Sequence, residues 1–267
     1  MKITNMFSIL FLYLFFLITI FLFQRKMIYF PETYSLDRQT ELISPFNLKP
    51  WPSGENYRGF ISHNELAKTK GTILVFHGNA GSARGRLYYV DALEKLGYRV
   101  ILAEYPGYGA RTGQPSESVF IEDSLKTALL ARQSFDGSFF LWGESIGAGV
   151  VSGIVKTGKV KTDGIILMLP FDSLPSIAQH HYWFFLGKWL ARDKYDNIAN
   201  LKDYSGNAAV ILAEKDEIIP TKNTLKLYNS IAGEKQLWQI AESSHNSLPV
   251  HPSSAWWREV MAFVDNK

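Results

Sequence analysis

The sequence contains no cysteine among its 267 residues. This absence excludes disulfide bonds, a cysteine nucleophile and thiolate metal sites. A large excess of charge is also lacking, because 28 Lys and Arg residues stand against 25 Asp and Glu residues and no polybasic run is present. Nucleic acid is therefore not an expected partner. Internal repeats and low-complexity stretches are absent as well, and the composition, 46% hydrophobic and 20% charged, is typical of a globular protein.

One segment near the N-terminus lacks charge altogether. Residues 6–23 read MFSILFLYLFFLITIFLF and span roughly 27 Å as a helix, close to the thickness of the hydrocarbon layer. Gln24, Arg25 and Lys26 end this run. We predict a transmembrane anchor over residues 1–26 and a single-pass membrane protein. A cleaved signal peptide is the alternative, but it would have a shorter apolar core and a small-x-small cleavage site. Positive charges flank both ends, so the orientation stays open.

From residue 71 onward, short apolar runs alternate with longer helical patterns. The runs cover residues 72–76, 98–103, 138–142, 164–169, 209–213 and 236–240, and the helical patterns cover 83–96, 115–132, 146–156, a segment from about 220, and 253–264. Strands that are apolar throughout, with helices between them, indicate a parallel sheet covered on both faces. We therefore predict a doubly wound α/β domain over residues 27–267, with one or two antiparallel lead-in strands within 31–66 at the sheet edge.

Residues 171–206 interrupt the alternation with an aromatic-rich insertion. The insertion follows the carboxyl end of a strand, where open α/β sheets bind ligands. We predict a small helical lid and assign substrate binding to four of its side chains: Tyr182, Trp183, Phe184 and Trp189. Plain packing of a lid helix is the alternative interpretation. No metal is expected at His180 and His181, because adjacent residues rarely face one ion and no partner ligands are evident.

The segment Gly143-Glu144-Ser145-Ile146-Gly147 matches the pattern G-x-S-x-G. The match is short, but it begins directly after an apolar strand and runs into a helix, which is the context of a nucleophile elbow. The two glycines leave room for a strained turn, and a helix N-terminus favours a developing anion. We predict Ser145 as the nucleophile; the alternative is an ordinary serine N-cap with incidental glycines.

A second turn, residues 77–81 (HGNAG), ends an earlier strand. A flexible turn in this place can direct a backbone N–H at an acyl oxygen, and the residue after the nucleophile supplies a second donor. We assign the oxyanion hole to the N–H groups of Asn79 and Ile146, with Ala80 as the alternative to Asn79. His77 is interpreted as a structural residue that shapes the turn.

The remaining catalytic groups follow from chain order, because the acid and then the histidine come after the serine on this kind of fold. Only His245 and His251 follow the last core strands, and His245 stands in a polar loop directly after residues 236–240. We predict His245 as the base, with His251 as the alternative. Asp216, directly after the apolar run 209–213, is the predicted acid. Its rivals are Asp172, Glu214 and Glu217.

Short motifs occur in one order over about residues 24–250: QRKMIYFP, FHGNAG, EYPGYG, GESIGAG, PFDS, EKDEIIP and SSHN. With them the sequence resembles the α/β-hydrolase superfamily, and most closely the membrane-anchored α/β-hydrolase-domain serine hydrolases, in a serine aminopeptidase- or esterase-like branch. The resemblance implies a triad of Ser145, Asp216 and His245, hydrolysis of esters or thioesters, and no cofactor.

Together these patterns predict a monomeric serine hydrolase that acts on a small-molecule or lipid-like acyl substrate. An apolar acyl group is expected because the lid is aromatic. Two alternatives remain open at this point: a membrane-tethered binding protein on a hydrolase fold, since a fold does not determine a function, and an aminopeptidase with the same catalytic groups.

Overall fold

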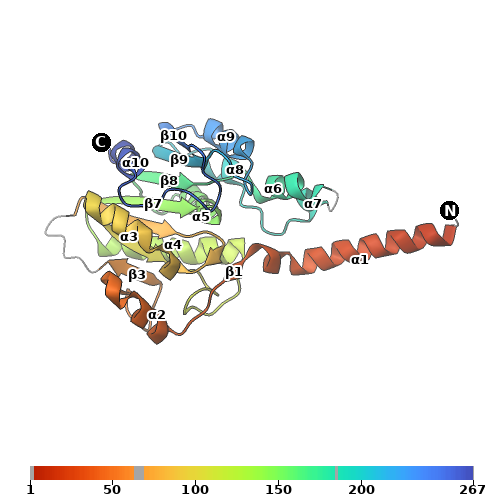
Figure 1. The fold of residues 1–267 in the computed structure, drawn as a ribbon, viewed down its shortest axis with the longest axis horizontal. Helices are drawn as coiled ribbons and strands as arrows, with labels where there is room; N and C mark the ends of the chain where they lie inside the picture. Colours follow the sequence, from red (N-terminus) through yellow and green to blue (C-terminus); the bar gives the residue numbers. More distant parts are fainter. Residues whose placement is uncertain (1–2, 63–68, 184–185, 267) are drawn as a thin grey trace.

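The computed structural model describes residues 3–62, 69–183 and 186–266. A long helix, α1 (Ile3–Ile28), projects away from a body in which helices flank one central sheet (Figure 1). A short parallel pairing of β1 (Phe30–Pro31) with β5 (Ala80–Gly81) joins the end of α1 to the body. The helix is therefore attached to the domain directly, and no long linker separates the two.

The central sheet has eight strands within the described residues, in the order β10-β9-β8-β7-β4-β6-β3-β2. Their bounds are β2 (Leu48–Trp51), β3 (Gly59–Ser62), β4 (Gly71–Phe76), β6 (Tyr98–Ala103), β7 (Ser138–Glu144), β8 (Gly164–Met168), β9 (Asn207–Ala213) and β10 (Lys235–Ile240). The six strands from β10 to β6 are parallel, whereas β3 pairs antiparallel with β6 and with β2. The predicted parallel sheet and its antiparallel lead-in strands are confirmed.

Helices cover both faces of this sheet, as the apolar strands require. Successive residues of β4 alternate between the two cores: Leu74 and Phe76 pack on one face, Ile73 and Val75 on the other. The first face carries α4 (Glu117–Ser134), α5 (Ile146–Lys156), α8 (Asn197–Leu201) and α9 (Thr221–Ser230). The second carries α3 (Leu87–Leu93) and α10 (Ala255–Val264).

Two helical regions differ from the sequence prediction. The helix expected over residues 83–96 is divided into η2 (Ala83–Arg86), α3 and η3 (Glu94–Leu96), because Arg86 has φ −116° and ψ 27° and leaves the helical region. The region before β2 contains the unpredicted α2 (Leu36–Ile43) and η1 (Ser44–Phe46). In α2 the Ser35 hydroxyl accepts a hydrogen bond from the Arg38 N–H, an N-cap that precedes only two turns of helix.

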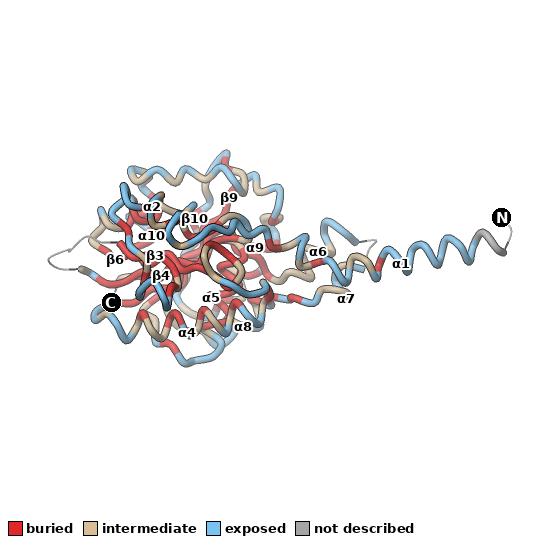
Figure 2. The backbone as a smooth tube through the Cα atoms, turned by 90° about the horizontal axis from the view of Figure 1, so that it is seen from below, coloured by how far each residue is buried: buried red, intermediate tan, exposed pale blue. Residues whose placement is uncertain are grey.

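The insertion between β8 and β9 forms the predicted helical lid. It contains α6 (Leu174–His181), α7 (Gly187–Leu190) and then α8, which returns the chain to the body. Figures 1 and 2 both place α6 and α7 on the side of the molecule from which α1 projects. Phe184, one of the predicted substrate-binding residues, lies outside the described residues.

Helix α1 has the length and composition of a membrane span over Met6–Ile28. Most of its side chains are exposed, as the tube in Figure 2 shows, and they include Phe7, Phe11 and Leu12, each more than 60% exposed. An apolar helix that no protein surface covers is stable only in an apolar medium. The predicted boundary at residue 26 falls within the last turn of this continuous helix.

Candidate active site

Ser145 stands at the junction of β7 and α5, in the middle of the sheet. Its backbone has φ 53° and ψ −114°, and α5 begins at the next residue. A Cβ on Gly143 would lie 2.4 Å from the Gly147 carbonyl oxygen, and a Cβ on Gly147 would lie 2.1 Å from that of Phe76. Both glycines are thus required by close backbone contacts. Gly149 leaves room for the ring of Tyr195, which lies 2.5 Å from the ideal Cβ position of this glycine.

The turn after β4 lies beside Ser145 because β4 and β7 are parallel neighbours in register. Phe76 pairs with Gly143, so the segments that follow β4 and β7 leave the sheet at the same level. An ideal Cβ on Gly78 would lie 3.7 Å from the Ser145 Cβ. The next residue, Asn79, is held on two sides: its side-chain amide donates to the Ile28 carbonyl at 2.7 Å, and its carbonyl accepts from the Tyr108 hydroxyl at 2.6 Å.

Among the hydrogen bonds of the described residues, none uses the backbone N–H of Asn79 as donor. Ile146 is the first residue of α5, where a backbone N–H has no partner within its own helix. Both predicted oxyanion donors therefore lie at the edge of the sheet that carries Ser145. Ala80, the alternative donor, pairs with Phe30 in the β1–β5 ladder. The oxyanion role of Asn79 and Ile146 stays a prediction.

Asp216 and His245 come from loops at the ends of β9 and β10. Because Ala213 pairs with Ile240, the two loops leave neighbouring strands at one level. His245 Nδ1 lies 2.8 Å from Asp216 Oδ2, and its Nε2 lies 3.2 Å from Ser145 Oγ. The other carboxylate oxygen of Asp216 accepts from the N–H groups of Ile218 and Ile219 at 2.9 and 2.7 Å. One continuous chain of hydrogen bonds thus links the serine, the histidine and the aspartate.

The rival residues form other hydrogen bonds than those of the proposed triad side chains. Asp172 accepts from Asn223 Nδ2 at 2.8 Å and from Lys226 Nζ at 3.0 Å. Burial raises the pKa of Asp172, but the bonds from Asn223 and Lys226 outweigh it and hold the pKa below its ordinary value. Glu214 accepts from the Glu242 N–H, Glu217 accepts from the backbone N–H of His245, and the His251 ring contacts Ser253.

Glu144, the residue between Gly143 and Ser145 in the elbow, lies in a polar cluster that the sequence did not predict. Its carboxylate accepts from Arg86 Nε at 2.9 Å, from the Tyr88 hydroxyl at 2.8 Å and from the Tyr89 hydroxyl at 3.2 Å. Burial raises the pKa of Glu144, but the Arg86 charge and the bond from Tyr88 hold it below the ordinary value. These hydrogen bonds hold the side chain of Glu144, the residue before Ser145, in place. The sequence spacing does not predict this contact, although the three partners of Glu144 follow the HGNAG turn closely: Arg86, Tyr88 and Tyr89.

His77 occupies a buried structural position next to the same turn. Its Nε2 lies 3.1 Å from Glu104 Oε1 and its Nδ1 lies 2.7 Å from the Gly78 carbonyl oxygen. The Glu104 carboxylate also accepts from the Ala83 N–H. The imidazole thus ties the turn after β4 to the turn after β6. No hydrogen bond in the described part of the chain joins His77 to Ser145.

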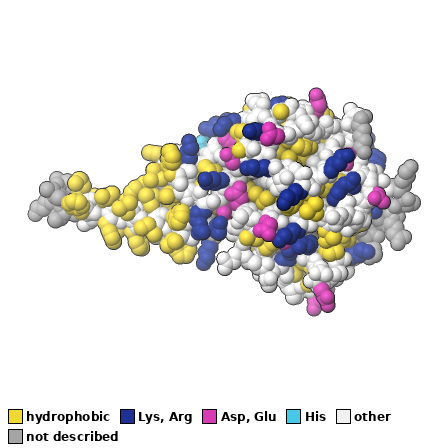
Figure 3. Space-filling model, turned by 180° about the vertical axis from the view of Figure 1, so that it is seen from behind, with side chains coloured by type: hydrophobic (Ala, Val, Ile, Leu, Met, Phe, Trp, Pro, Cys, Tyr) yellow, Lys and Arg dark blue, Asp and Glu magenta, His cyan; other side chains and the backbone are white. Residues whose placement is uncertain are grey.

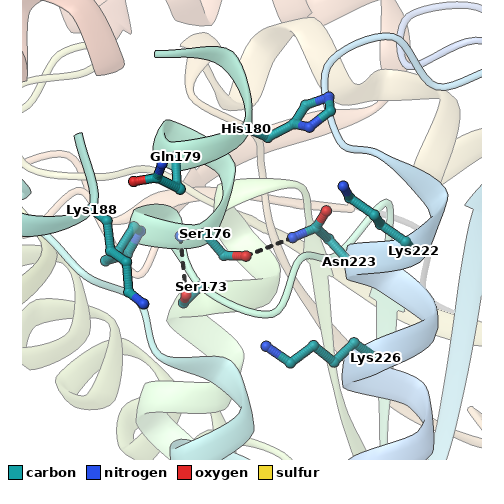
Figure 4. Close-up of a pocket in the computed structure, with 9 residues that line it drawn as sticks. Ser173, Ser176, Gln179, His180, Lys188, Lys222, Asn223 and Lys226 are labelled. Carbon is teal, nitrogen blue, oxygen red and sulfur yellow. Dashed lines mark hydrogen bonds between the residues drawn. The ribbon is translucent and has the colours of Figure 1, made fainter. Parts of the chain in front are cut away.

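A pocket of about 450 Å³ lies between the lid and α9 (Figure 4). Basic side chains on both sides face it: Lys188 and His180 from the lid, Lys222 and Lys226 from α9. Asn223, only 4% exposed, bonds to Ser176 Oγ at 2.8 Å across its floor. Nowhere in the described ranges do three His, Asp or Glu residues gather as a metal site would require.

The lid contacts the loop that carries the predicted acid. His181 Nε2 lies 2.8 Å from the Ile218 carbonyl oxygen, and the Ile218 N–H is one of the donors to Asp216. The predicted substrate-binding side chains of the lid point outward, with exposed fractions of 51% for Tyr182, 67% for Trp183 and 77% for Trp189. Their role in substrate binding stays a prediction.

Comparison with known proteins agrees with this architecture. The family model described as serine aminopeptidase, S33, matches residues 67–196. The lysophosphatidylserine lipase ABHD12 of Xenopus tropicalis is 32% identical over 191 residues, which cover 64% of this chain and 50% of that protein. The chain thus spans about half the length of the curated relatives it matches first.

Solved structures match the fold over most of the chain. A lipase-esterase related protein from Clostridium acetobutylicum superposes with a TM-score of 0.59 at 15% identity and covers 73% of this chain and 95% of its own. The α/β hydrolase GrgF from Penicillium sp. sh18 gives a TM-score of 0.61 at 13% identity, over 77% of this chain and 92% of its own. With the sheet order, the strained elbow and the sequence relatives taken together, this chain belongs to the α/β-hydrolase superfamily.

Proposed function

We propose that this protein is a membrane-anchored serine hydrolase that cleaves a carboxylic ester or thioester bond of a lipid-like substrate. The observation that carries the proposal is the chain of hydrogen bonds from Ser145 Oγ through His245 to Asp216, on a strained elbow at the carboxyl edge of the sheet. The family model and the lipase name of the Xenopus tropicalis relative support a hydrolase that acts on lipid esters.

The proposed mechanism follows from the geometry. His245 Nε2 takes the proton of Ser145 as Oγ attacks the acyl carbon, and the Asp216 carboxylate holds the ring by its Nδ1–H and stabilises the imidazolium. The N–H groups of Asn79 and Ile146 receive the tetrahedral oxyanion. The imidazolium then gives its proton to the leaving alcohol or thiol. A water molecule, deprotonated by His245, cleaves the acyl-enzyme and releases the carboxylic acid.

We propose in addition that α1 crosses the membrane and keeps the domain at its surface. The length and apolar composition of Met6–Ile28 and the exposure of its side chains support this placement. A tethered hydrolase meets substrate in the same bilayer, so a lipid-like ester is the expected substrate class.

The experiment that tests the activity labels the full chain in detergent micelles with a fluorescent fluorophosphonate. We expect labelling of the parent chain and of Ser134→Ala, an exposed serine on α4, and none of Ser145→Ala. The same proteins are assayed on p-nitrophenyl esters of increasing acyl length, where turnover is lost only in Ser145→Ala. A folded parent chain that neither labels nor turns over an ester contradicts the proposal and favours a binding protein.

A further inference from the structure

The last turn of α1 holds the outer end of the lid. Gln24 Nε2 donates to the Leu190 carbonyl at 3.1 Å, and the Gln24 side-chain oxygen accepts from the Arg192 N–H at 2.7 Å. Arg25 forms two hydrogen bonds with the Asp193 carboxylate, at 3.0 and 2.8 Å. Asp193 is only 2% exposed. A buried carboxylate bound in this way fixes the lid relative to the helix.

These contacts also set the depth of the lid relative to the apolar span. The uncharged run ends at Phe23, and Gln24 is the first residue of the polar end. The Leu190 carbonyl lies level with Gln24, to which it is bonded. The Arg192 guanidinium lies over the ring of Phe21, 5.5 Å from its centroid. The end of α7 is therefore level with the point where the hydrocarbon layer would end on α1.

The exposed surface of the lid has the composition of a membrane interface. Trp189, the residue before Leu190, is 77% exposed, and the rest of this surface is made by Tyr182 (51%), Trp183 (67%) and Leu186 (41%). So many large aromatic and aliphatic side chains in water indicate a binding surface. Trp and Tyr favour the boundary between hydrocarbon and water, because their rings are apolar and their N–H or O–H groups are polar.

Basic residues lie close in sequence to this surface and at the end of α1. Arg25 and Lys26 end α1, and Lys188 and Arg192 flank Trp189 in the lid. In Figure 3 the lysine and arginine side chains gather where the apolar helix meets the body. Such an arrangement is complementary to the negative headgroups of a membrane leaflet.

We propose that the lid and the end of α1 form one bilayer-binding surface, with Tyr182, Trp183, Leu186 and Trp189 in the interfacial layer of the leaflet nearest the domain. This inference rests on the proposed membrane anchor. It assigns the outer face of the aromatic lid to lipid contact, whereas the sequence suggested substrate binding for three of these residues, Tyr182, Trp183 and Trp189.

The inner end of the lid gives this surface a role in substrate access. His181 contacts the Ile218 carbonyl, on the loop that positions Asp216. The lid thus extends from the bilayer surface to the catalytic loops.

The absence of native cysteine allows a direct test, because a single introduced cysteine carries a single label. The full chain is reconstituted into vesicles of phosphatidylcholine and phosphatidylserine, with an environment-sensitive fluorophore at Trp189→Cys or Trp183→Cys. Phe11→Cys, on α1, is the embedded reference. Lys161→Cys, exposed in the loop before β8 at the opposite edge of the sheet, is the matched control. Lipids with a nitroxide near the headgroup or near the acyl end quench the fluorophore according to its depth.

We expect the headgroup-level nitroxide to quench the labels at 189 and 183 several-fold more than the label at 161, and the deep nitroxide to quench the label at 11. Lid labels quenched no more than the label at 161 overturn the proposal, and so does an unquenched label at 11. Fluorophosphonate labelling of the same samples separates this result from catalysis. Quenched lid labels on a protein that does not react with the probe support the surface and contradict the proposed activity.

Discussion

At the scale of single residues, the site depends on one unusual backbone conformation. Ser145 has a positive φ of 53°, in a region that L-residues rarely occupy. Such a conformation costs about 1–3 kcal/mol and persists only where the surroundings impose it. Here the Ser145 N–H donates to the Met168 carbonyl at 2.8 Å, and the preceding Glu144 is held by Arg86 and two tyrosines. The strain places Oγ above the sheet, within reach of His245.

Substitution of Asp216 tests whether its carboxylate orients the His245 imidazole. In Asp216→Asn the side-chain oxygen still accepts from Ile218 and Ile219, but the amide donates to His245 Nδ1 and reverses the tautomer. We expect kcat on a short p-nitrophenyl ester to fall by about 10⁴-fold with the fold intact. Glu217→Gln, which keeps its acceptor for the His245 N–H, is the control and retains activity. A loss below tenfold in Asp216→Asn contradicts the assigned role.

Substitution of Gly78 tests whether the space beside Ser145 is needed for activity. A methyl group there would lie 3.7 Å from the Ser145 Cβ and 3.1 Å from Glu144 Oε1. We expect Gly78→Ala to fold, because the nearest atom belongs to a side chain, yet to lose about 10²-fold in kcat/KM as the oxyanion turn shifts. Gly85→Ala, which meets no atom within 4 Å, is the matched control and should equal the parent. Equal activity in both variants would show that the turn is not part of the site.

At the scale of elements, β4, β6, β7, β8 and β9 were predictable because each is a mainly apolar run bounded by turn residues. The helix over 146–156 was predicted at its observed bounds, since the elbow defines its start and Lys156 its end. The positions of Ser145, Asp216 and His245 at strand ends followed from the same pattern. Glu144, Arg86 and Tyr88 did not, because a polar cluster between separate loops leaves no periodic signal. Helix α2 was missed for a related reason: it is short and buries only Gln39 and Ile43.

The attachment of α4 to the sheet edge depends on Asp123. Its carboxylate accepts from Arg111 Nη2 at 2.8 Å and from Arg58 Nη1 at 3.2 Å. Burial raises the pKa of Asp123, but the two arginines outweigh it and lower the pKa below 3.8. A carboxyl group with a lowered pKa in the folded state stabilises the protein above its unfolded pKa, and this stabilisation is lost as pH falls through the folded value.

We expect Asp123→Asn to lower the free energy of unfolding by roughly 2–3 kcal/mol at pH 7, because it removes charged hydrogen bonds. The difference from the parent should begin to shrink as pH falls below about 4, where the carboxyl group of the unfolded chain is protonated, and it should vanish as pH falls through the lower pKa of the folded carboxyl group. Urea unfolding in detergent micelles at several pH values measures this difference in the free energy of unfolding. Glu122→Gln, at an exposed neighbour that pairs with Lys126, is the control. A difference that is constant over the whole pH range is incompatible with this explanation.

At the scale of the whole molecule, the helix α1 and the lid act as one unit through Arg25 and Asp193. Among the described residues, Arg25→Ala leaves the buried Asp193 with the Tyr29 hydroxyl as its side-chain hydrogen-bond donor, 3.0 Å from its Oδ2. Because the Arg25 side chain is itself 36% exposed, its removal costs less than the roughly 3–5 kcal/mol of a fully buried ion pair. We expect amide hydrogen exchange over residues 186–196 to rise by at least about tenfold, with the sheet unchanged. Lys26→Ala, which removes an exposed side chain whose ammonium lies over the Phe23 ring, should exchange like the parent. Unchanged exchange in Arg25→Ala would mean that the lid is held by other contacts.

The order of the strands has a consequence for biosynthesis. Ser145 and His245 are 100 residues apart, and the histidine follows β10, the outermost strand at one side of the sheet. Translation makes α1 first and β10 nearly last, and a domain generally folds as a unit. The segment of the serine elbow is therefore synthesised well before the segment that carries His245, its proposed base. We expect a chain that stops before residue 245, and so lacks this histidine, to have no hydrolase activity.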